Sequence, residues 1–166
     1  AAADSPPTVI LLDVMDTLVK DPFYDHMPAF FGLTFAELLA QKHPTAWLEF
    51  ERGEISEAAF AAKFFRDGRG ADGAALAAHM GARYEFLDGV EDLLKRLSAA
   101  AATGGAFELH ACSNYPAWWQ IVEERTALSR YLPWTFLSCE GPMRGRRKPE
   151  AGAFAAVAAH LGAPPA

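Results

Sequence analysis

Cysteine is scarce in this sequence, with only Cys112 and Cys139 among 166 residues. Two thiols cannot build a disulfide framework or a four-cysteine zinc site. Both lie in apolar runs typical of strands, so we expect them to be buried and reduced. No apolar run approaches the ~18 residues of a membrane span, so we expect a soluble protein with no membrane partner.

Positive charge is also in short supply. The 15 Lys and Arg residues are outnumbered by 21 Asp and Glu, which gives a formal net charge of -6. A general nucleic-acid binder needs a basic face, so this balance favours a small-molecule substrate and no nucleic acid. The basic run Arg144, Arg146, Arg147 and Lys148 is by default a solvated loop patch. Residues 1–7 are small, polar or Pro and predict a flexible leader.

Three short apolar runs predict buried parallel strands at residues 8–14, 107–112 and 134–139. Residues 18–86, by contrast, show helical periodicity almost throughout. We predict helix starts at Thr34, Ser56, Asp72 and Asp88, and further helices over residues 43–51, 118–128 and 149–161.

This order predicts an α/β fold, a Rossmann-like three-layer parallel sheet with a helical insertion after its first strand. Within it we expect a leader (1–7), an α/β core (8–17 and 87–166) and a helical cap (18–86).

Polar residues follow each predicted strand, where parallel sheets bind ligands. Asp13 ends the first strand, Ser113 and Asn114 end the second, and Lys148 follows the third through a loop. A carboxylate at the tip of a buried strand needs a cation or backbone donors. The hydroxyl and amide suit a phosphate oxygen, and the lysine could neutralise both phosphate and carboxylate.

The succession strand-DVMDTLV, strand-CSN and RRKP-helix resembles the first three motifs of the haloacid dehalogenase superfamily, and the insertion resembles its type-1 cap. Longer runs such as DVMDTLVKDPFYDHMPAFFG and SNYPAWWQIVEE resemble the plant chloroplast flavin mononucleotide (FMN) hydrolase group. The resemblance covers nearly the whole chain from residue 8.

The resemblance implies a phosphatase that acts on a small phosphorylated metabolite, possibly FMN. Asp13 would form an aspartyl-phosphate intermediate, Ser113 and Lys148 would bind the transferring phosphoryl group, and Asn114 would contact substrate. Mg²⁺ would be held by the Asp13 carboxylate and the Met15 backbone carbonyl. The implied location is the chloroplast; without the resemblance it would be the cytoplasm.

Two features depart from the family pattern. Met15 stands where these phosphatases usually carry a second Asp that protonates the leaving group, and a thioether cannot do so. We expect the neighbouring Asp16 to bond the turn backbone instead. A haloalkanoate dehalogenase, whose leaving halide needs no proton, is therefore an alternative, and a non-catalytic relative that binds a ligand or partner is another.

The second departure is that no acidic fourth motif follows the Lys148 helix. We therefore expect a C-terminally incomplete core that is weakly active or inactive. The first strand would keep an unpaired hydrophobic edge, through which the chain could dimerise.

The insertion is rich in aromatic residues, most of which we expect to form its own core. One or two of them, or Trp118 and Trp119, could stack on an isoalloxazine ring. The five histidines show no metal-ligand spacing, and packing or surface roles are expected for them.

Overall fold

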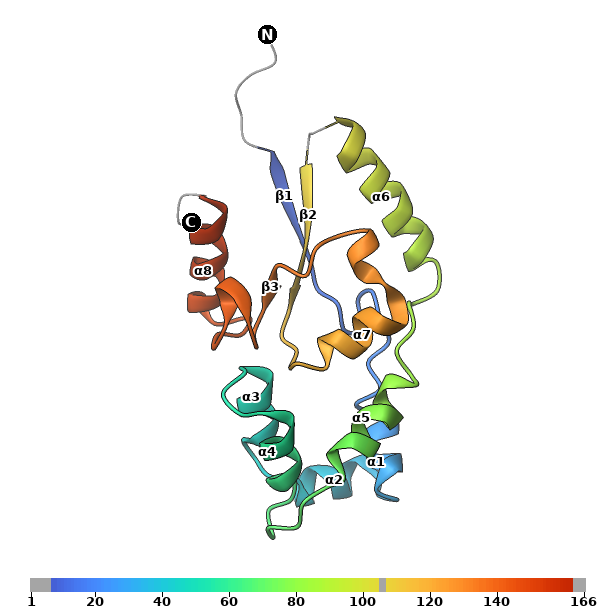
Figure 1. The fold of residues 1–166 in the computed structure, drawn as a ribbon, viewed down its shortest axis with the longest axis vertical. Helices are drawn as coiled ribbons and strands as arrows, with labels where there is room; N and C mark the ends of the chain where they lie inside the picture. Colours follow the sequence, from blue (N-terminus) through green and yellow to red (C-terminus); the bar gives the residue numbers. More distant parts are fainter. Residues whose placement is uncertain (1–6, 105–106, 163–166) are drawn as a thin grey trace.

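The computed structural model describes residues 7–104 and 107–162 (Figure 1). Its sheet contains β1 (Thr8–Leu12), β2 (Phe107–Ser113) and β3 (Phe136–Leu137), all parallel and in the order β1-β2-β3. Leu12 lies opposite Ala111, so the carboxyl ends of β1 and β2 meet at one edge of the sheet. This arrangement confirms the predicted parallel α/β fold.

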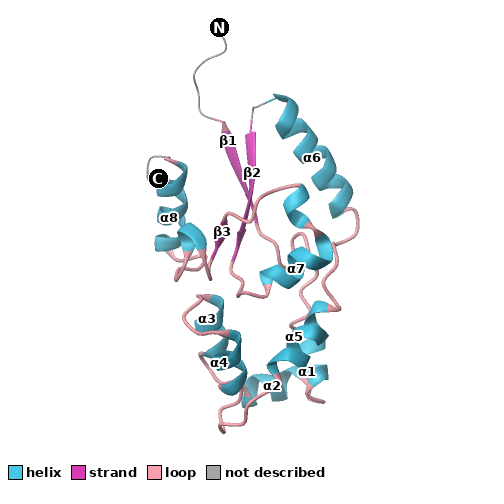
Figure 2. Cartoon of the chain, in the orientation of Figure 1, coloured by secondary structure: helices cyan, strands magenta, loops and turns pink. Residues whose placement is uncertain are grey.

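Helices flank the strands on two sides. Figure 2 shows α6 (Val90–Gly104) and α7 (Trp119–Thr126) on one side of β1 and β2, and α8 (Ala151–Leu161) on the other. The side chains of β2 alternate accordingly, because Leu109 packs in the cluster that contains residues of α6 and α7 whereas Cys112 packs with residues of α8. A strand with two buried faces is what a three-layer α/β core requires.

Five short helices follow β1 before the chain enters α6. They are α1 (His26–Phe30), α2 (Phe35–Gln41), α3 (Ala46–Glu51), α4 (Glu57–Ala62) and α5 (Gly73–Gly81). All lie beyond the carboxyl ends of the strands, in the lower part of Figure 1. We call residues 18–86, which contain them, the helical insertion.

The predicted helix caps within the insertion are confirmed. Thr34 accepts a hydrogen bond from the Glu37 amide while the Glu37 side chain accepts one from the Thr34 amide, which forms a capping box. Ser56 and Asp72 likewise accept from the amides three residues on, at the starts of α4 and α5. Each bond satisfies an amide that has no partner within the helix.

An aromatic cluster joins the insertion to α7. Phe50 and Phe60 stack at 4.9 Å, and the Trp118 ring packs edge-on against both. Trp118 is buried, and its Nε1 donates to the Glu57 carboxylate over 2.8 Å. The packing role expected for most of these aromatic residues is thereby confirmed, and Trp118 attaches the insertion to the α/β core.

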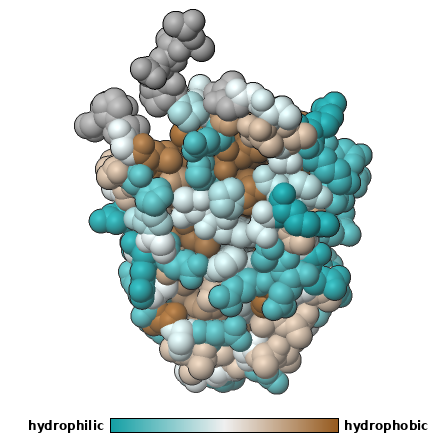
Figure 3. Space-filling view, turned by 45° about the horizontal axis from the view of Figure 1, so that its top comes forward, coloured by the Kyte–Doolittle hydropathy of each residue, from teal (hydrophilic) through white to brown (hydrophobic). Residues whose placement is uncertain are grey.

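The strands differ from prediction in two ways. None of the β1 residues is fully buried, although burial was expected; in the described sheet β1 pairs with β2 alone, which confirms the unpaired edge expected for this strand. Hydrophobic surface accordingly gathers near the top of Figure 3, close to the start of β1. The strand expected over residues 134–139 contains only Phe136 and Leu137: the Thr135 amide donates to the Pro133 carbonyl in a turn before the strand, and β2 ends at Ser113, opposite Leu137.

Helix boundaries also differ. The helix expected from His43 starts at Ala46, since Pro44 disfavours helical geometry in the residue before it. The last helix starts at Ala151, two residues after Pro149. Helix α1 was not predicted, because it is a single turn with Pro28 at its centre.

Both cysteines are buried and free, as expected. Burial raises the pKa of the Cys139 thiol to about 12, so it stays protonated at neutral pH. Within the described residues, no helix is both long and apolar enough to cross a membrane.

Candidate active site

Asp13 and Lys148 form an ion pair at the carboxyl end of the sheet. The Asp13 Oδ1 lies 3.0 Å from the Lys148 Nζ and also accepts the Val14 amide over 2.9 Å. The Lys148 Nζ donates to the Cys112 carbonyl over 2.6 Å, so strand β2 holds the ammonium in place. The Asp13 side chain remains 49% exposed, which leaves its other oxygen accessible to a ligand.

The turn after Asp13 is tightly bonded. The Val14 carbonyl accepts the amides of Thr17, Leu18 and Val19, and Asp16 has a φ of +55°. The Asp16 carboxylate bonds backbone, as expected, but its partner is the Asp21 amide, 2.9 Å away and five residues on, rather than the turn beside Thr17. This turn fixes the direction in which the chain leaves Asp13.

Asn114 binds the backbone of Lys148. Its Oδ1 accepts the Lys148 amide over 2.8 Å, and its Nδ2 donates to the Lys148 carbonyl over 2.9 Å. Only one N–H of the amide is left for a substrate. The structure therefore gives Asn114 a positioning contact that the sequence did not predict, and its contact with substrate stays a prediction.

Ser113 presents a buried hydroxyl with no hydrogen-bond partner among the described residues. The side chain is 1% exposed and lies at the end of β2, next in sequence to Cys112 and Asn114. Native structures seldom leave a buried hydroxyl without a partner, because its desolvation is not compensated. The Ser113 Oγ therefore keeps an unused hydrogen-bonding capacity at the end of β2.

A cavity of about 240 Å³ opens between the strand ends and the insertion. It is lined by Met15, Asp21, Phe23, Tyr24, Trp47, Glu51, Asn114, Tyr115 and Arg147. Four of these residues are aromatic, and one wall carries the Asn114 that holds Lys148. A larger, more polar hollow of about 640 Å³ lies around Lys20 and Asp25, and it shares only Asp21 with the first. The smaller cavity is the one beside the predicted site residues.

Two acidic residues of the cavity escaped prediction. Glu51, at the end of α3, is 4% exposed, and its Oε1 accepts Arg147 Nε over 2.7 Å. Burial raises the pKa of the Asp21 carboxyl to about 6, although a hydrogen bond from the Phe23 amide opposes the shift. In the sequence both resemble ordinary solvated carboxylates, and no local pattern indicates that they are buried or that they line a cavity.

Two tyrosine hydroxyls lie behind the cavity. Tyr84 and Tyr115 are joined by a hydrogen bond of 2.6 Å, and burial raises the pKa of both. Both therefore remain neutral, and Tyr115 contributes a polar ring to the cavity wall.

Comparisons with known proteins agree with this geometry, although no family model matches the chain. Flavin mononucleotide hydrolase 1, a chloroplast protein of Arabidopsis thaliana, is 46% identical over 157 residues, which cover 95% of this chain. The chain spans 61% of the length of that relative.

Solved structures share the fold. A HAD family enzyme from Bacteroides thetaiotaomicron, solved with magnesium and inorganic phosphate, is 21% identical with a TM-score of 0.70, covering 95% of this chain and 80% of that one. L-2-haloacid dehalogenase from Xanthobacter autotrophicus is 16% identical with a TM-score of 0.58, covering 96% and 67%. The chain thus shares the fold of these haloacid dehalogenase-like enzymes, with its parallel sheet and helical insertion, and is similar in sequence to the Arabidopsis hydrolase.

Proposed function

We propose that this chain is a phosphomonoester hydrolase that works through an aspartyl-phosphate on residue 13 and takes FMN as its substrate. The observation that carries the proposal is the pairing of the Asp13 carboxylate with the Lys148 ammonium at 3.0 Å, beside a strand that ends in the unpartnered Ser113 hydroxyl. FMN as substrate, and the chloroplast as location, rest on the similarity to the Arabidopsis hydrolase.

In the first step the Asp13 oxygen that is not bound to Lys148 attacks phosphorus. A new P–O bond forms, the bond from phosphorus to the ester oxygen breaks, and the leaving alkoxide takes up a proton from water, because Met15 cannot supply one. The Ser113 hydroxyl donates to a phosphoryl oxygen, and Lys148 neutralises negative charge in the transition state. Water then hydrolyses the aspartyl-phosphate, which releases inorganic phosphate and restores Asp13.

A magnesium ion fits two oxygens of this site. The Asp13 oxygen that does not attack phosphorus would be one ligand, and the Met15 carbonyl, which accepts no hydrogen bond from the described residues, would be the other. No group of three or more His, Cys, Asp or Glu side chains in the described parts of the chain could hold a metal, so the ion would keep several water ligands. When bound, Mg²⁺ would neutralise charge on the phosphoryl group.

The insertion serves in this proposal as the cap that selects the substrate. Its residues Phe23, Tyr24, Trp47 and Glu51 form much of the cavity wall, and the α/β core supplies Asn114 and Arg147. A cavity with walls from both parts encloses a substrate only while the insertion is docked.

A single-turnover assay tests the proposal even if turnover is slow. The chain, in excess over FMN and with Mg²⁺, should release riboflavin and phosphate, whereas Asp13→Asn should release neither. Phosphate release that is the same for both proteins would refute Asp13 as nucleophile. No release from FMN or other phosphate esters, together with halide release from a haloalkanoate, would favour the dehalogenase alternative.

A further inference from the structure

The wall of the 240 Å³ cavity contains an ion pair between a buried carboxylate and a partly exposed guanidinium, which the catalytic proposal does not use. Glu51 of α3 accepts the Arg147 Nε over 2.7 Å through one carboxylate oxygen and the Trp47 Nε1 over 3.1 Å through the other. All three residues line the cavity. The Glu51 carboxylate therefore fixes the orientation of a guanidinium and an indole in the same wall.

Arg147 keeps part of its donor capacity. Its backbone amide donates to Glu150 and its Nε to Glu51, while its two Nη groups donate to no acceptor within the described residues. A guanidinium is planar, so fixing the Nε also fixes the direction of the Nη donors. The result is a pre-oriented pair of donors in the wall of the cavity.

The other walls suit a flat ring. Phe23, Trp47 and Tyr115 contribute aromatic surface, with Trp47 centred 5.9 Å from Phe23 and 6.2 Å from Tyr115. Tyr24 also lines the cavity and is 54% exposed. The volume is below the ~300 Å³ that encloses a drug-sized ligand, so it fits one ring system with the rest of the substrate outside it.

Charge decides between two classes of ligand group. Glu51 neutralises Arg147, and the nearby Asp21 adds negative character when ionised, so the wall does not attract a second phosphate or carboxylate. Neutral carbonyl oxygens on the edge of a ring can still accept from the Nη groups. The cavity therefore favours a heteroaromatic ring with carbonyl acceptors over a second anionic group.

We propose that Arg147 determines substrate specificity by donating to the carbonyl edge of a planar heteroaromatic ring, and that Glu51 is the positioning residue that orients it. This inference rests on the proposed phosphatase function and adds to it the group that selects the substrate. Because Arg147 directly precedes Lys148, neighbouring residues of one loop would recognise the ring and the phosphate.

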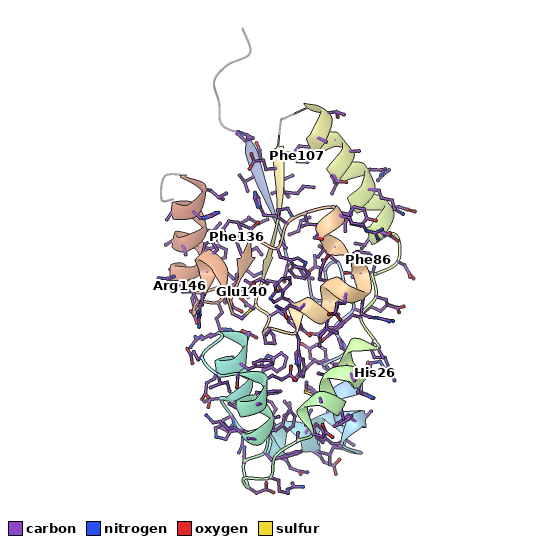
Figure 4. All side chains as sticks on the ribbon, viewed as in Figure 1. His26, Phe86, Phe107, Phe136, Glu140 and Arg146 are labelled. Atoms are coloured by element: carbon purple, nitrogen blue, oxygen red, sulfur yellow. The ribbon has the colours of Figure 1, made fainter. Side chains whose placement is uncertain are left out.

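A binding experiment with riboflavin tests the ring contact without the phosphate or the chemistry. We expect wild type to quench riboflavin fluorescence on binding, and Arg147→Met to bind at least about tenfold more weakly, because it loses charge-assisted hydrogen bonds. Arg146→Met is the matched control: Arg146 is exposed, donates no described side-chain hydrogen bond and lies at the outer margin of the molecule near α8 (Figure 4). It should bind riboflavin as wild type does.

Removing Arg147 alone leaves Glu51 buried and unpaired, which could unfold the protein. The double variant Glu51→Gln/Arg147→Met removes both charges, and it should fold and still bind riboflavin weakly. Glu51→Gln alone keeps an acceptor for the Nε and should lose less affinity than Glu51→Ala. Wild-type affinity in a folded Arg147 variant, equal weakening by Arg146→Met, or no riboflavin binding by wild type would each overturn the inference.

Kinetics separate this inference from the proposed function. Arg147→Met should lower kcat/KM for FMN by about tenfold or more while leaving that for glycerol 3-phosphate, which has no ring, within about twofold. An equal loss on both substrates overturns the specificity role but leaves the phosphatase standing. If wild type releases phosphate from neither substrate, the proposed function fails, and the riboflavin titration still decides the ring contact.

Discussion

The side chain of Asn114 and the backbone of Lys148 exchange two hydrogen bonds, 2.8 and 2.9 Å long, across 34 residues of sequence. These bonds, with that from the Lys148 Nζ to the Cys112 carbonyl, hold the ammonium next to Asp13. The position of the lysine thus depends on the end of β2 as well as on its own loop.

Asn114→Ala should therefore impair the chemistry more than substrate binding. We expect kcat to fall by about 10- to 100-fold with a smaller change in KM, because the lysine loses its fixed position. Asn114→Asp keeps the acceptor for the Lys148 amide, so its kcat should lie between those of wild type and Asn114→Ala. Steady-state kinetics on FMN measure both constants, and a rise in KM with unchanged kcat would contradict the positioning role.

Ser113→Ala should separate function from stability. The hydroxyl has no partner among the described residues, so we expect the free energy of unfolding to change by less than about 0.5 kcal/mol. Phosphate release should nevertheless slow by about 10- to 100-fold, because a donor to the phosphoryl group is lost. Urea denaturation and single-turnover assays give the two quantities.

Ser138 is the matched control, since its buried hydroxyl donates to the Glu51 carbonyl over 2.6 Å and accepts the Tyr115 amide over 3.0 Å. Ser138→Ala should lower the free energy of unfolding by about 1 to 3 kcal/mol. Equal destabilisation by the two variants would mean that Ser113 has a structural partner.

Asp21 should make stability depend on pH. Burial raises the pKa of its carboxyl from 3.8 to about 6. Between pH 3.8 and about 6 the carboxyl is therefore protonated in the folded state but ionised in the unfolded state. Its contribution to stability is therefore present below pH 3.8 and is lost as pH rises to about 6. Asp21→Asn, which cannot ionise, should be more stable than wild type near neutral pH by on the order of 1 kcal/mol.

The difference between Asp21→Asn and wild type should shrink as pH falls through this window. Urea denaturation at a series of pH values measures it. If the difference in the free energy of unfolding grew toward low pH, the predicted direction of the pKa shift of Asp21 would be wrong.

Gly53→Ala should disturb the docking of the insertion. A Cβ at residue 53 would lie 2.2 Å from the Cys139 carbonyl oxygen, and the residue has a φ of +68°. We expect a loss of about 3 kcal/mol or more, because backbone strain and a backbone clash act together. Gly32→Ala shares the positive φ, at +66°, but a Cβ there meets nothing within 4 Å.

The Gly32 variant should therefore lose only about 1 kcal/mol. Thermal and urea unfolding compare the two variants. Similar losses would show that the contact between residues 53 and 139 adds nothing to the backbone effect.

Much of the fold could be predicted because its signals are local. Thr34 with Glu37 and Ser56 with Ala59 lie three residues apart in sequence, and each pair forms the predicted cap. The meeting of Asp13 with Lys148 could be predicted as well, because carboxyl ends of parallel strands share an edge.

What could not be predicted depends on distant partners. Glu51 binds Arg147, 96 residues away, and nothing in its helix distinguishes it from a solvated glutamate. The point at which β3 ends depends on where β2 ends, at Ser113, rather than on its own apolar run. The open edge of β1, by contrast, could be predicted, because no further acidic motif and strand follow the Lys148 helix in this sequence.

Residues 147 and 148 are adjacent, yet their partners lie in different parts of the molecule: Glu51 of the insertion binds the first, and Asn114 at the end of β2 binds the second. One peptide unit thus links the helical insertion to the lysine that pairs with Asp13, the proposed nucleophile. If α3 moves away from the core, it either breaks the pair between Glu51 and Arg147 or strains the backbone beside Lys148. Movement of the insertion would then change the position of Lys148 through the backbone, while a substrate is still bound.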